Sequence, residues 1–310
     1  RWNRRGGLMQ VRACGVNFPD LLMVQGKYQF APPLPFSPGG EVAGVVAEVG
    51  ARVRRFRVGD PVVVPSRHGG FATDLQVDEA DRCCLPMPDG MSFVEASAFA
   101  TTYGTTLFAL RHRARLQPGE TLVVLGAAGG CGSAAIELGK WMGARVIAAA
   151  STDDKLQVCK ELGADDLVNY SSGPSRLKKR LKELGGANVI FDVVGGEYTE
   201  AALRSIAWNG RHLVIGFTSG SIPKVALNLA LLKNCSIVGV FWGAWRALEP
   251  EASDAELKEL GELFRQKIIR PRVTRTYSLE EAAQCLEDFA NRKVIGKVVL
   301  VPSRGTPARL

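Results

Sequence analysis

The middle of the chain alternates apolar runs of strand length with amphipathic stretches of helical period. The apolar runs are rich in β-branched residues and occupy Leu122–Leu125, Arg145–Ala150, Asp166–Val168, Val189–Val193, Arg211–Ile215 and Ser236–Val240. The helical stretches between them include Lys155–Leu162, Arg176–Leu184 and Glu197–Ile206. Because strand and helix alternate at this spacing, we predict an α/β fold with right-handed βαβ units on a doubly wound parallel sheet.

The first hundred residues show a different pattern, in which short strands are separated by closely spaced turns. Strands are expected at Leu8–Cys14, Val42–Val49 and Val62–Val64, and a short helix at Asp20–Gln25. A long loop rich in proline and glycine covers residues 26–41, and a helical pattern covers residues 94–110. Short strands with such turns are typical of an antiparallel, barrel-like unit.

The tail returns to the style of the first hundred residues. It contains a predicted strand at Arg272–Tyr277, a helix at Leu279–Asn291 and a last strand at Lys297–Val301. We expect these elements to fold back onto the N-terminal unit. The predicted organisation is therefore a discontinuous domain made of residues 1–102 and 243–310, with a nucleotide-binding domain at residues 103–242 between the two segments.

A glycine-rich turn joins the first strand of the middle region to its first helix. Gly126, Gly129, Gly130 and Gly132 follow the apolar run, and the helical pattern begins directly after them. Ala127, Gly129 and Gly132 take the three positions of the G-x-G-x-x-G fingerprint, with Cys131 inside it. Glycine allows close approach of the backbone to a pyrophosphate, and the N–H groups at the helix start face its charge. A tight turn without a ligand also favours glycine, but the flanking strand and helix favour dinucleotide binding.

The tip of the second strand indicates which dinucleotide binds. A dinucleotide fold that takes NAD places an acidic residue there, on the ribose hydroxyls. This strand ends at Ala150 and Ser151, and Lys155 follows one turn into the next helix. A hydroxyl and an ammonium suit a 2′-phosphate, so the sequence favours NADP(H). Asp153 and Asp154 are expected to act as caps at the helix start, and the alternative for Lys155 is a solvated surface lysine.

Composition narrows the class of protein. The chain has 310 residues and a formal net charge of +8, which permits an acidic ligand without establishing nucleic-acid binding. No apolar run reaches the roughly 18 residues that a membrane span needs. The seven cysteines show no regular framework, so we expect reduced thiols in an intracellular compartment. A cytoplasmic location is the first expectation, with a mitochondrial one left open.

Four stretches together resemble a known family. Residues 15–28 (GVNFPDLLMVQGKY), 32–46 (PPLPFSPGGEVAGVV), 126–155 (GAAGGCGSAAIELGKWMGARVIAAASTDDK) and 161–170 (ELGADDLVNY) are similar to the zinc-free quinone oxidoreductase branch of the medium-chain dehydrogenase/reductase superfamily. The resemblance implies a GroES-like domain, a Rossmann domain between its two segments, NADPH in the cleft and a homodimer. It also implies further strand sequence before Leu8, so the first segment is expected to be N-terminally incomplete.

The resemblance also indicates which positions of this chain correspond to zinc ligands in related enzymes. In zinc alcohol dehydrogenases the position of Asn17 is a cysteine ligand and the position of Gly40 is a histidine ligand, so two expected ligands are replaced. A structural zinc lobe needs four close cysteines, which Cys83 and Cys84 cannot supply. His68 is a lone loop histidine, and an unsupported histidine is more often solvated than a ligand. We therefore predict a metal-free protein.

The resemblance implies a set of site residues. Asn17 and Tyr28 are expected beside the nicotinamide as catalytic residues, where an amide or a hydroxyl can bond a developing enolate or quinol oxygen. Tyr170 is expected near the 2′-phosphate. Other cofactor contacts are expected from Gly216, Phe217, Phe241, Trp242 and Lys297. The alternatives are an Asn17 that ties a turn, a Tyr28 that covers a loop, and strand-end aromatics that are plain core.

The predicted function is NADPH-dependent hydride transfer to a quinone without a metal. Reduction of an enone or enal is the alternative within the same superfamily. A different class, an NADPH-binding protein with a single-stranded RNA-binding or structural role, is suggested by the basic runs at residues 52–57 and 176–182. No aromatic residues are interleaved with the basic side chains of these runs, as stacking on single strands would require, so nucleic acid is not the expected partner.

Overall fold

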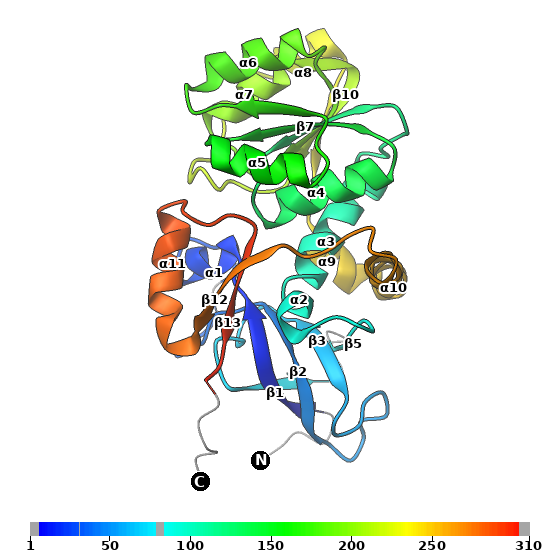
Figure 1. The fold of residues 1–310 in the computed structure, drawn as a ribbon, viewed down its shortest axis with the longest axis vertical. Coiled ribbons are helices and arrows are strands. Elements are labelled where there is room, and N and C mark those ends of the chain that lie inside the picture. The colour runs from blue at the N-terminus through cyan, green and yellow to red at the C-terminus, as the bar shows by residue number, and fades with distance from the viewer. Residues whose placement is uncertain (1–5, 31, 79–83, 304–310) are drawn as a thin grey trace. The chain divides into compact units, whose positions relative to one another are not determined.

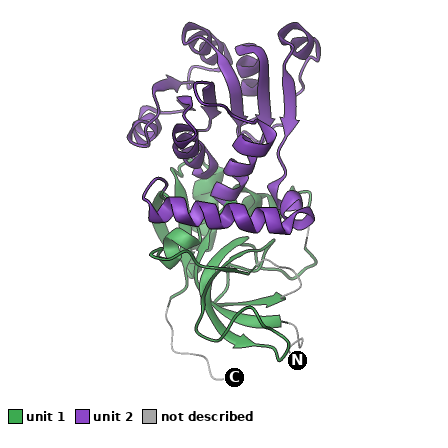
Figure 2. Cartoon of the chain, turned by 90° about the vertical axis from the view of Figure 1, so that its right-hand side faces the viewer, with its two compact units in different colours: residues 1–101, 270–310 green, residues 102–269 purple. Residues whose placement is uncertain are grey.

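The computed structural model describes residues 6–30, 32–78 and 84–303. The chain divides into two compact units, the first made of residues 1–101 and 270–310 and the second of residues 102–269 (Figure 2). The second unit ends at residue 269, whereas the sequence analysis predicted that the nucleotide-binding domain ends at residue 242. Residues 243–269 join the second unit because their long helix carries Glu256 and Glu259, which pair with His112 and Arg111.

Unit 1 is built on one mixed sheet. Its described strands are β1 (Gly6–Gly15), β2 (Glu41–Val49), β3 (Pro61–Pro65), β4 (Asp74–Asp78), β5 (Leu85–Pro86), β12 (Val273–Ser278) and β13 (Lys297–Val301). They follow the order β12-β13-β1-β2-β3-β5, and β4 also pairs with β1. The late strand β13 runs antiparallel to β1, with Cys14 opposite Leu300 and Gly15 opposite Val299. The C-terminal segment thus completes the sheet that the N-terminal segment begins (Figure 1).

Short helices cover this sheet. They are α1 (Phe18–Val24), α2 (Phe93–Ala96), the 3-10 turn Leu279–Glu281 and α11 (Ala282–Ala290). Helix α1 begins after Asn17, and the carboxylate of Asp20 accepts the Asn17 N–H at 2.8 Å, which satisfies a donor at the helix start. The apolar core on this side contains Val16, Tyr277 and Leu300.

Unit 2 contains a parallel sheet of six described strands. These are β6 (Thr121–Leu125), β7 (Arg145–Ala150), β8 (Asp166–Asn169), β9 (Ala187–Asp192), β10 (Ile206–Val214) and β11 (Ser236–Gly239). Their order is β11-β10-β9-β6-β7-β8, and every described pairing is parallel. The order reverses between β6 and β9, and a doubly wound sheet binds its ligand at such a point. The predicted α/β class is confirmed.

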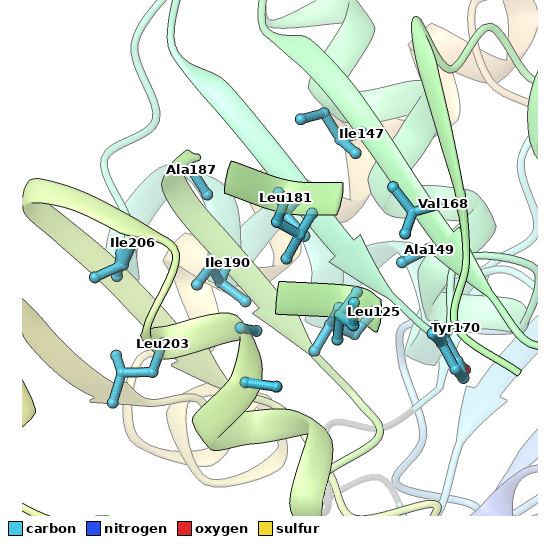
Figure 3. Packing of buried hydrophobic residues seen from close by; sticks show 14 of the residues in the cluster. Leu125, Ile147, Ala149, Val168, Tyr170, Leu181, Ala187, Ile190, Leu203 and Ile206 are labelled. Carbon is cyan, nitrogen blue, oxygen red and sulfur yellow. The ribbon is translucent and has the colours of Figure 1, made fainter. Parts of the chain in front are cut away.

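Unit 2 also contains helices, some of which cover the faces of this sheet. They are α3 (Ala100–Leu107, which begins at the boundary), the π-helix Phe108–Arg113, α4 (Gly130–Trp141), α5 (Asp153–Glu161), α6 (Pro174–Glu183), α7 (Glu197–Leu203), α8 (Asn228–Lys233), α9 (Trp242–Leu248) and α10 (Pro250–Arg265). Helices α4 and α5 cover one face of the sheet, and α6 and α7 cover the other (Figure 1). Leu125, Ile190 and Leu181 belong to one cluster of buried apolar side chains in this unit (Figure 3).

Candidate functional site

The glycine turn after β6 requires glycine at two positions, Gly126 and Gly132. Gly126 has φ +69°, a left-handed conformation that favours glycine. A Cβ added to Gly132 would lie 2.4 Å from the Gly126 oxygen. Gly129 is the residue that precedes the 12-residue helix α4, and it has no side chain to cap the helix. The first N–H groups of α4 therefore meet the requirements of a phosphate site.

The other residues of the fingerprint lie in the same turn. Ala127 is fully buried, and its N–H donates to the Ala149 oxygen at 3.1 Å, which fixes the turn against β7. Gly130 and Cys131 form the first turn of α4 and are half-buried. The Cys131 carbonyl accepts from the Thr106 hydroxyl at 3.4 Å. The structure thus brings the five predicted phosphate-binding residues into one turn.

The residues predicted at the 2′-phosphate belong to two neighbouring strand ends and to the helix that follows the first of them. Strands β7 and β8 end side by side, with Ala150 opposite Asn169, so Ser151 and Tyr170 follow on neighbouring strands. Lys155 is half-buried in the first turn of α5, and its N–H donates to the Thr152 hydroxyl at 3.4 Å. Tyr170 is 9% exposed, and its ring lies 4.8 Å from that of Tyr198.

Helix α5 begins at Asp153, two residues before the predicted helical stretch, and its cap is Thr152 rather than Asp153 or Asp154, which lie in its first turn. The Asp153 carboxylate accepts a hydrogen bond from the Asn169 amide at 2.7 Å, and Thr152 is the N-cap. Asp153 is therefore engaged by the neighbouring strand end. No acidic side chain stands at the strand tip itself, Ala150-Ser151.

The predicted residues at the later strand ends do not share one environment. The Gly216 N–H donates to the backbone carbonyl oxygen of Asp192 at 3.3 Å, and the Phe217 ring packs against Gly195. Phe241 is 62% exposed. Trp242, expected at a strand end, instead begins α9 and packs against Gly104, so its indole contributes to the core of unit 2.

Sequence reasoning missed a buried pair at this edge of the sheet. The Asp192 carboxylate accepts the N–H groups of Val194 and Gly195 at 2.8 and 2.9 Å, the Thr199 hydroxyl at 2.6 Å and the His212 ring at 3.2 Å. Burial raises the pKa of Asp192, but the bonds from His212 and its other donors outweigh it, and the pKa ends below its usual value. An aspartate at the end of a buried strand, three residues before a Gly-Gly pair, was the available signal.

Asn17, one of the two catalytic candidates, lies in a polar cluster with the buried side chains of Glu41 and Lys297. The Lys297 ammonium donates to the Asn17 Oδ1 at 2.7 Å, to the Glu41 Oε2 at 3.0 Å and to the Val16 oxygen at 3.2 Å. The Asn17 Nδ2 donates to the Glu41 Oε2 at 3.1 Å. The Glu41 Oε1 accepts the Thr101 N–H at 2.8 Å. Lys297 therefore contacts Asn17, and its three N–H bonds have protein acceptors; contact with a cofactor stays a prediction.

A second carboxylate lies beside this cluster. Asp20 is fully buried and accepts the N–H groups of Asn17 and Gly39. Its burial raises the pKa to about 6, although the two hydrogen bonds act in the opposite sense. Tyr28 is half-buried, and burial followed by the charge of Asp20 raises the pKa of its hydroxyl. Asp20 and Glu41 were missed as site residues, although Glu41 ends the Gly-Gly-Glu motif.

The residues present do not fit a zinc ion. Asn17 offers an amide whose oxygen already accepts from an ammonium, and Gly40 offers no side chain. In the ranges 6–30, 32–78 and 84–303, no three His, Cys, Asp or Glu side chains are grouped as metal ligands. His68 lies between the rings of Phe30 and Phe36, at 6.1 and 6.4 Å. Cys83 falls outside the described residues.

Comparison with known proteins identifies the two units. Residues 5–107 match the alcohol dehydrogenase GroES-like domain, and residues 130–258 match the family described as zinc-binding dehydrogenase. Quinone oxidoreductase-like protein 2 of Bos taurus is 40% identical over 94% of this chain and 84% of that protein. The chain belongs to the quinone oxidoreductase-like branch of the medium-chain dehydrogenase/reductase superfamily. The predicted family and its two-domain fold are confirmed.

Other members of the superfamily agree with this assignment. Quinone oxidoreductase of Pseudomonas aeruginosa is 33% identical over 94% of this chain and 89% of that protein. The crystal structure of Escherichia coli quinone oxidoreductase complexed with NADPH is 28% identical, with a TM-score of 0.88, and covers 96% of this chain and 92% of that one. The chain is an oxidoreductase of this superfamily by descent.

The basic runs behave as solvated faces. In α6, Leu177 and Leu181 are fully buried, while Arg180 pairs with Glu183 on the outer side. In the first run, the Arg54 guanidinium donates to the Ala51 and Val53 carbonyls of its own loop.

Among the described helices, none is both long and apolar enough to cross a membrane.

Proposed function

We propose that the protein transfers hydride from NADPH to a quinone without a metal. The observation that carries the cofactor choice is the non-acidic tip of β7, which ends in Ala150 and is followed by Ser151 instead of a carboxylate. The NADPH complex of the E. coli relative supports the same choice. Gly129, Gly130, Cys131 and Gly132 would hold the pyrophosphate, and Ser151, Lys155 and Tyr170 would hold the 2′-phosphate.

The chemistry divides between the cofactor and the chain. When bound, the reduced nicotinamide supplies the hydride, and one proton from solvent or protein completes the quinol. Tyr28 is the best placed of the predicted residues to bond the reacting oxygen, because its hydroxyl makes no hydrogen bond to a described residue. Its raised pKa keeps it protonated at neutral pH, so it can donate.

Asn17 has a different part in this proposal. Its Nδ2 group is already engaged by the Glu41 carboxylate at 3.1 Å and, more weakly, by the Gly15 oxygen at 3.4 Å. A substrate oxygen would have to compete with these acceptors. Asn17 therefore shapes the site, and Tyr28 is the donor that we assign to the reacting oxygen.

An acceptor screen tests this function. Wild-type protein and Tyr28→Phe are offered ortho-quinones, para-quinones, enals and simple alcohols, and NADPH oxidation or NADP⁺ reduction is followed by absorbance. We expect quinone reduction, no alcohol oxidation, and a lower kcat for Tyr28→Phe with little change in the KM for NADPH. Reduction of enals alone would move the activity to the alternative substrate class. Binding of NADPH without reduction of any acceptor would contradict the enzyme assignment.

We also propose that a second copy of the chain covers the outer edge of the parallel sheet. Strand β11 ends the strand order, and it carries Ile237 at 41% exposure. Leu231, Leu232 and Phe241, near it in the chain, are exposed as well. An exposed apolar edge strand is prone to pair, and pairing with its own copy satisfies both edges. Light scattering should give a dimer and Ile237→Lys should give a monomer; a monomeric wild type contradicts the proposal.

A further inference from the structure

The backbone conformation of Gly296, directly before β13, brings Lys297 into the interior of unit 1. Gly296 has φ +64°, and a Cβ there would lie 2.6 Å from the Arg272 oxygen. Glycine thus allows the chain to turn closely under Arg272, whose oxygen then accepts the Lys297 N–H at 2.9 Å. Lys297 enters the sheet beside the end of β1, and its side chain is only 5% exposed. A lysine is almost never buried to this degree unless it is paired.

The groups around this ammonium match its hydrogen-bonding capacity. An ammonium has three N–H donors and no acceptor, and Lys297 has three oxygen acceptors within 3.2 Å. They are one carbonyl, one amide and one carboxylate, and the carboxylate of Glu41 is fully buried. Glu41 supplies the opposite charge, so the pair is neutral in an apolar setting.

This pair fixes the orientation of the Asn17 side chain. With Oδ1 toward Lys297 and Nδ2 toward Glu41, the amide accepts from the cation and donates to the anion. The flipped amide would place N–H groups against the ammonium and an oxygen against the carboxylate. Both contacts of the flipped form are repulsive, so only one orientation is stable.

We propose that the Lys297 ammonium is the resident cation of this oxygen cluster, acting as a positioning residue that locks Asn17 in one orientation. The resemblance to zinc alcohol dehydrogenases implies metal ligands at the positions of Asn17 and Gly40, and the residues here do not fit a metal. A protein cation instead neutralises Glu41 and takes the Asn17 oxygen. The role in turnover rests on the proposed function, whereas the pairing does not.

Chemical rescue, followed by thermal unfolding, tests the pairing of Lys297 with Glu41 and needs no activity assay. Lys297→Ala removes three methylenes and the ammonium, which propylamine supplies in its protonated form. Because Glu41 loses its counter-ion, we expect the melting temperature to fall by about 6 °C or more. Propylamine at about ten times its dissociation constant should restore about 3 °C, and 1-propanol, its uncharged match, should restore none. The exposed Lys293, which forms an ion pair with Asp288, provides the control variant Lys293→Ala.

Kinetics and cofactor binding test the positioning role. Lys297→Ala should lower kcat about tenfold or more while the Kd for NADPH stays within about twofold, and propylamine should raise kcat. A large rise in the Kd for NADPH without amine rescue would make Lys297 a cofactor contact and overturn the proposal. Equal melting temperatures of Lys297→Ala and wild type would also overturn it.

A second variant covers the case in which Lys297→Ala does not fold. Lys297→Met/Glu41→Gln removes both charges at nearly constant volume, and it should melt above Lys297→Met, in which Glu41 is left alone. A double variant no more stable than the single one would contradict the pairing. If wild-type protein reduces no acceptor, the proposed function fails, while the melting and rescue measurements still decide on the resident cation.

Discussion

Alanine substitutions of Gly132 and Gly129, in the glycine turn after β6, should impair different properties of the protein. A Cβ on Gly132 would lie 2.4 Å from the Gly126 oxygen and 2.7 Å from the Ala127 Cα, so backbone atoms must move. A Cβ on Gly129 would meet only the Gly126 oxygen, at 3.4 Å, which is an ordinary contact. Gly132→Ala is therefore a packing defect, and Gly129→Ala is a matched control within three residues.

The expected magnitudes follow from these contacts. Overpacking of a dense turn costs about 1–3 kcal/mol, and with an m-value of about 2 kcal/mol per M the urea midpoint of Gly132→Ala should fall by about 0.5–1.5 M. Gly129→Ala places alanine at an N-cap in place of glycine, which costs about 1 kcal/mol at most. Its added methyl group, however, stands where the backbone would approach the pyrophosphate, so NADPH affinity should fall.

Urea unfolding and NADPH fluorescence titration of the two variants measure these effects. We expect Gly132→Ala to lose mainly stability, and Gly129→Ala to lose mainly NADPH affinity. Wild-type stability of Gly132→Ala would refute the steric argument. Wild-type NADPH affinity of Gly129→Ala would show that the pyrophosphate does not lie at this turn.

Three further predictions concern charge. Lys155→Ala should weaken NADPH by about 1.5 kcal/mol or less, because the lysine is half-buried, and should leave NADH nearly unchanged; equal wild-type affinity for both cofactors would contradict the phosphate site. The pKa of buried Asp20 is raised to about 6, so the stability that it contributes is present below about pH 4 and is lost as the pH rises to 6. The free energy of unfolding of wild type should therefore fall across this range relative to Asp20→Asn, and parallel curves would refute the shift. Protein purified without chelator should carry far less than one equivalent of zinc by elemental analysis, and a full equivalent after dialysis would reverse the zinc-free prediction.

Buried strands were the elements that the sequence predicted best. Residues 145–150 and 297–301 were predicted with the bounds that the structure shows for β7 and β13. Both are apolar runs packed on two sides, so their local pattern and their tertiary environment agree. The predicted helical stretch over residues 94–110 is instead divided: a turn separates α2 from α3, and a π-helix follows α3 from Phe108. A π-turn shifts the register of the side chains in a way that no apolar period reveals.

The candidate residues of unit 2 and those of unit 1 were predictable to different degrees. The phosphate turn lies within one strand-turn-helix segment, so its residues are neighbours in sequence and the motif was sufficient. The cluster of Asn17, Glu41 and Lys297 depends on the pairing of β1 with β13, which no local pattern contains. Family resemblance indicated Asn17 and Lys297 separately, but only the folded sheet shows that they contact each other.

The bond between Lys297 and Asn17 joins residues 280 positions apart. Unit 2 is one continuous stretch, residues 102–269, and during synthesis it is complete before β13 leaves the ribosome. Domains generally fold as units while the chain emerges, so the parallel sheet can form while unit 1 still lacks the strand that pairs with β1. Translation thus imposes an order in which the nucleotide-binding half matures first. A nascent chain halted before Lys297 would have its phosphate turn but not its Asn17 cluster.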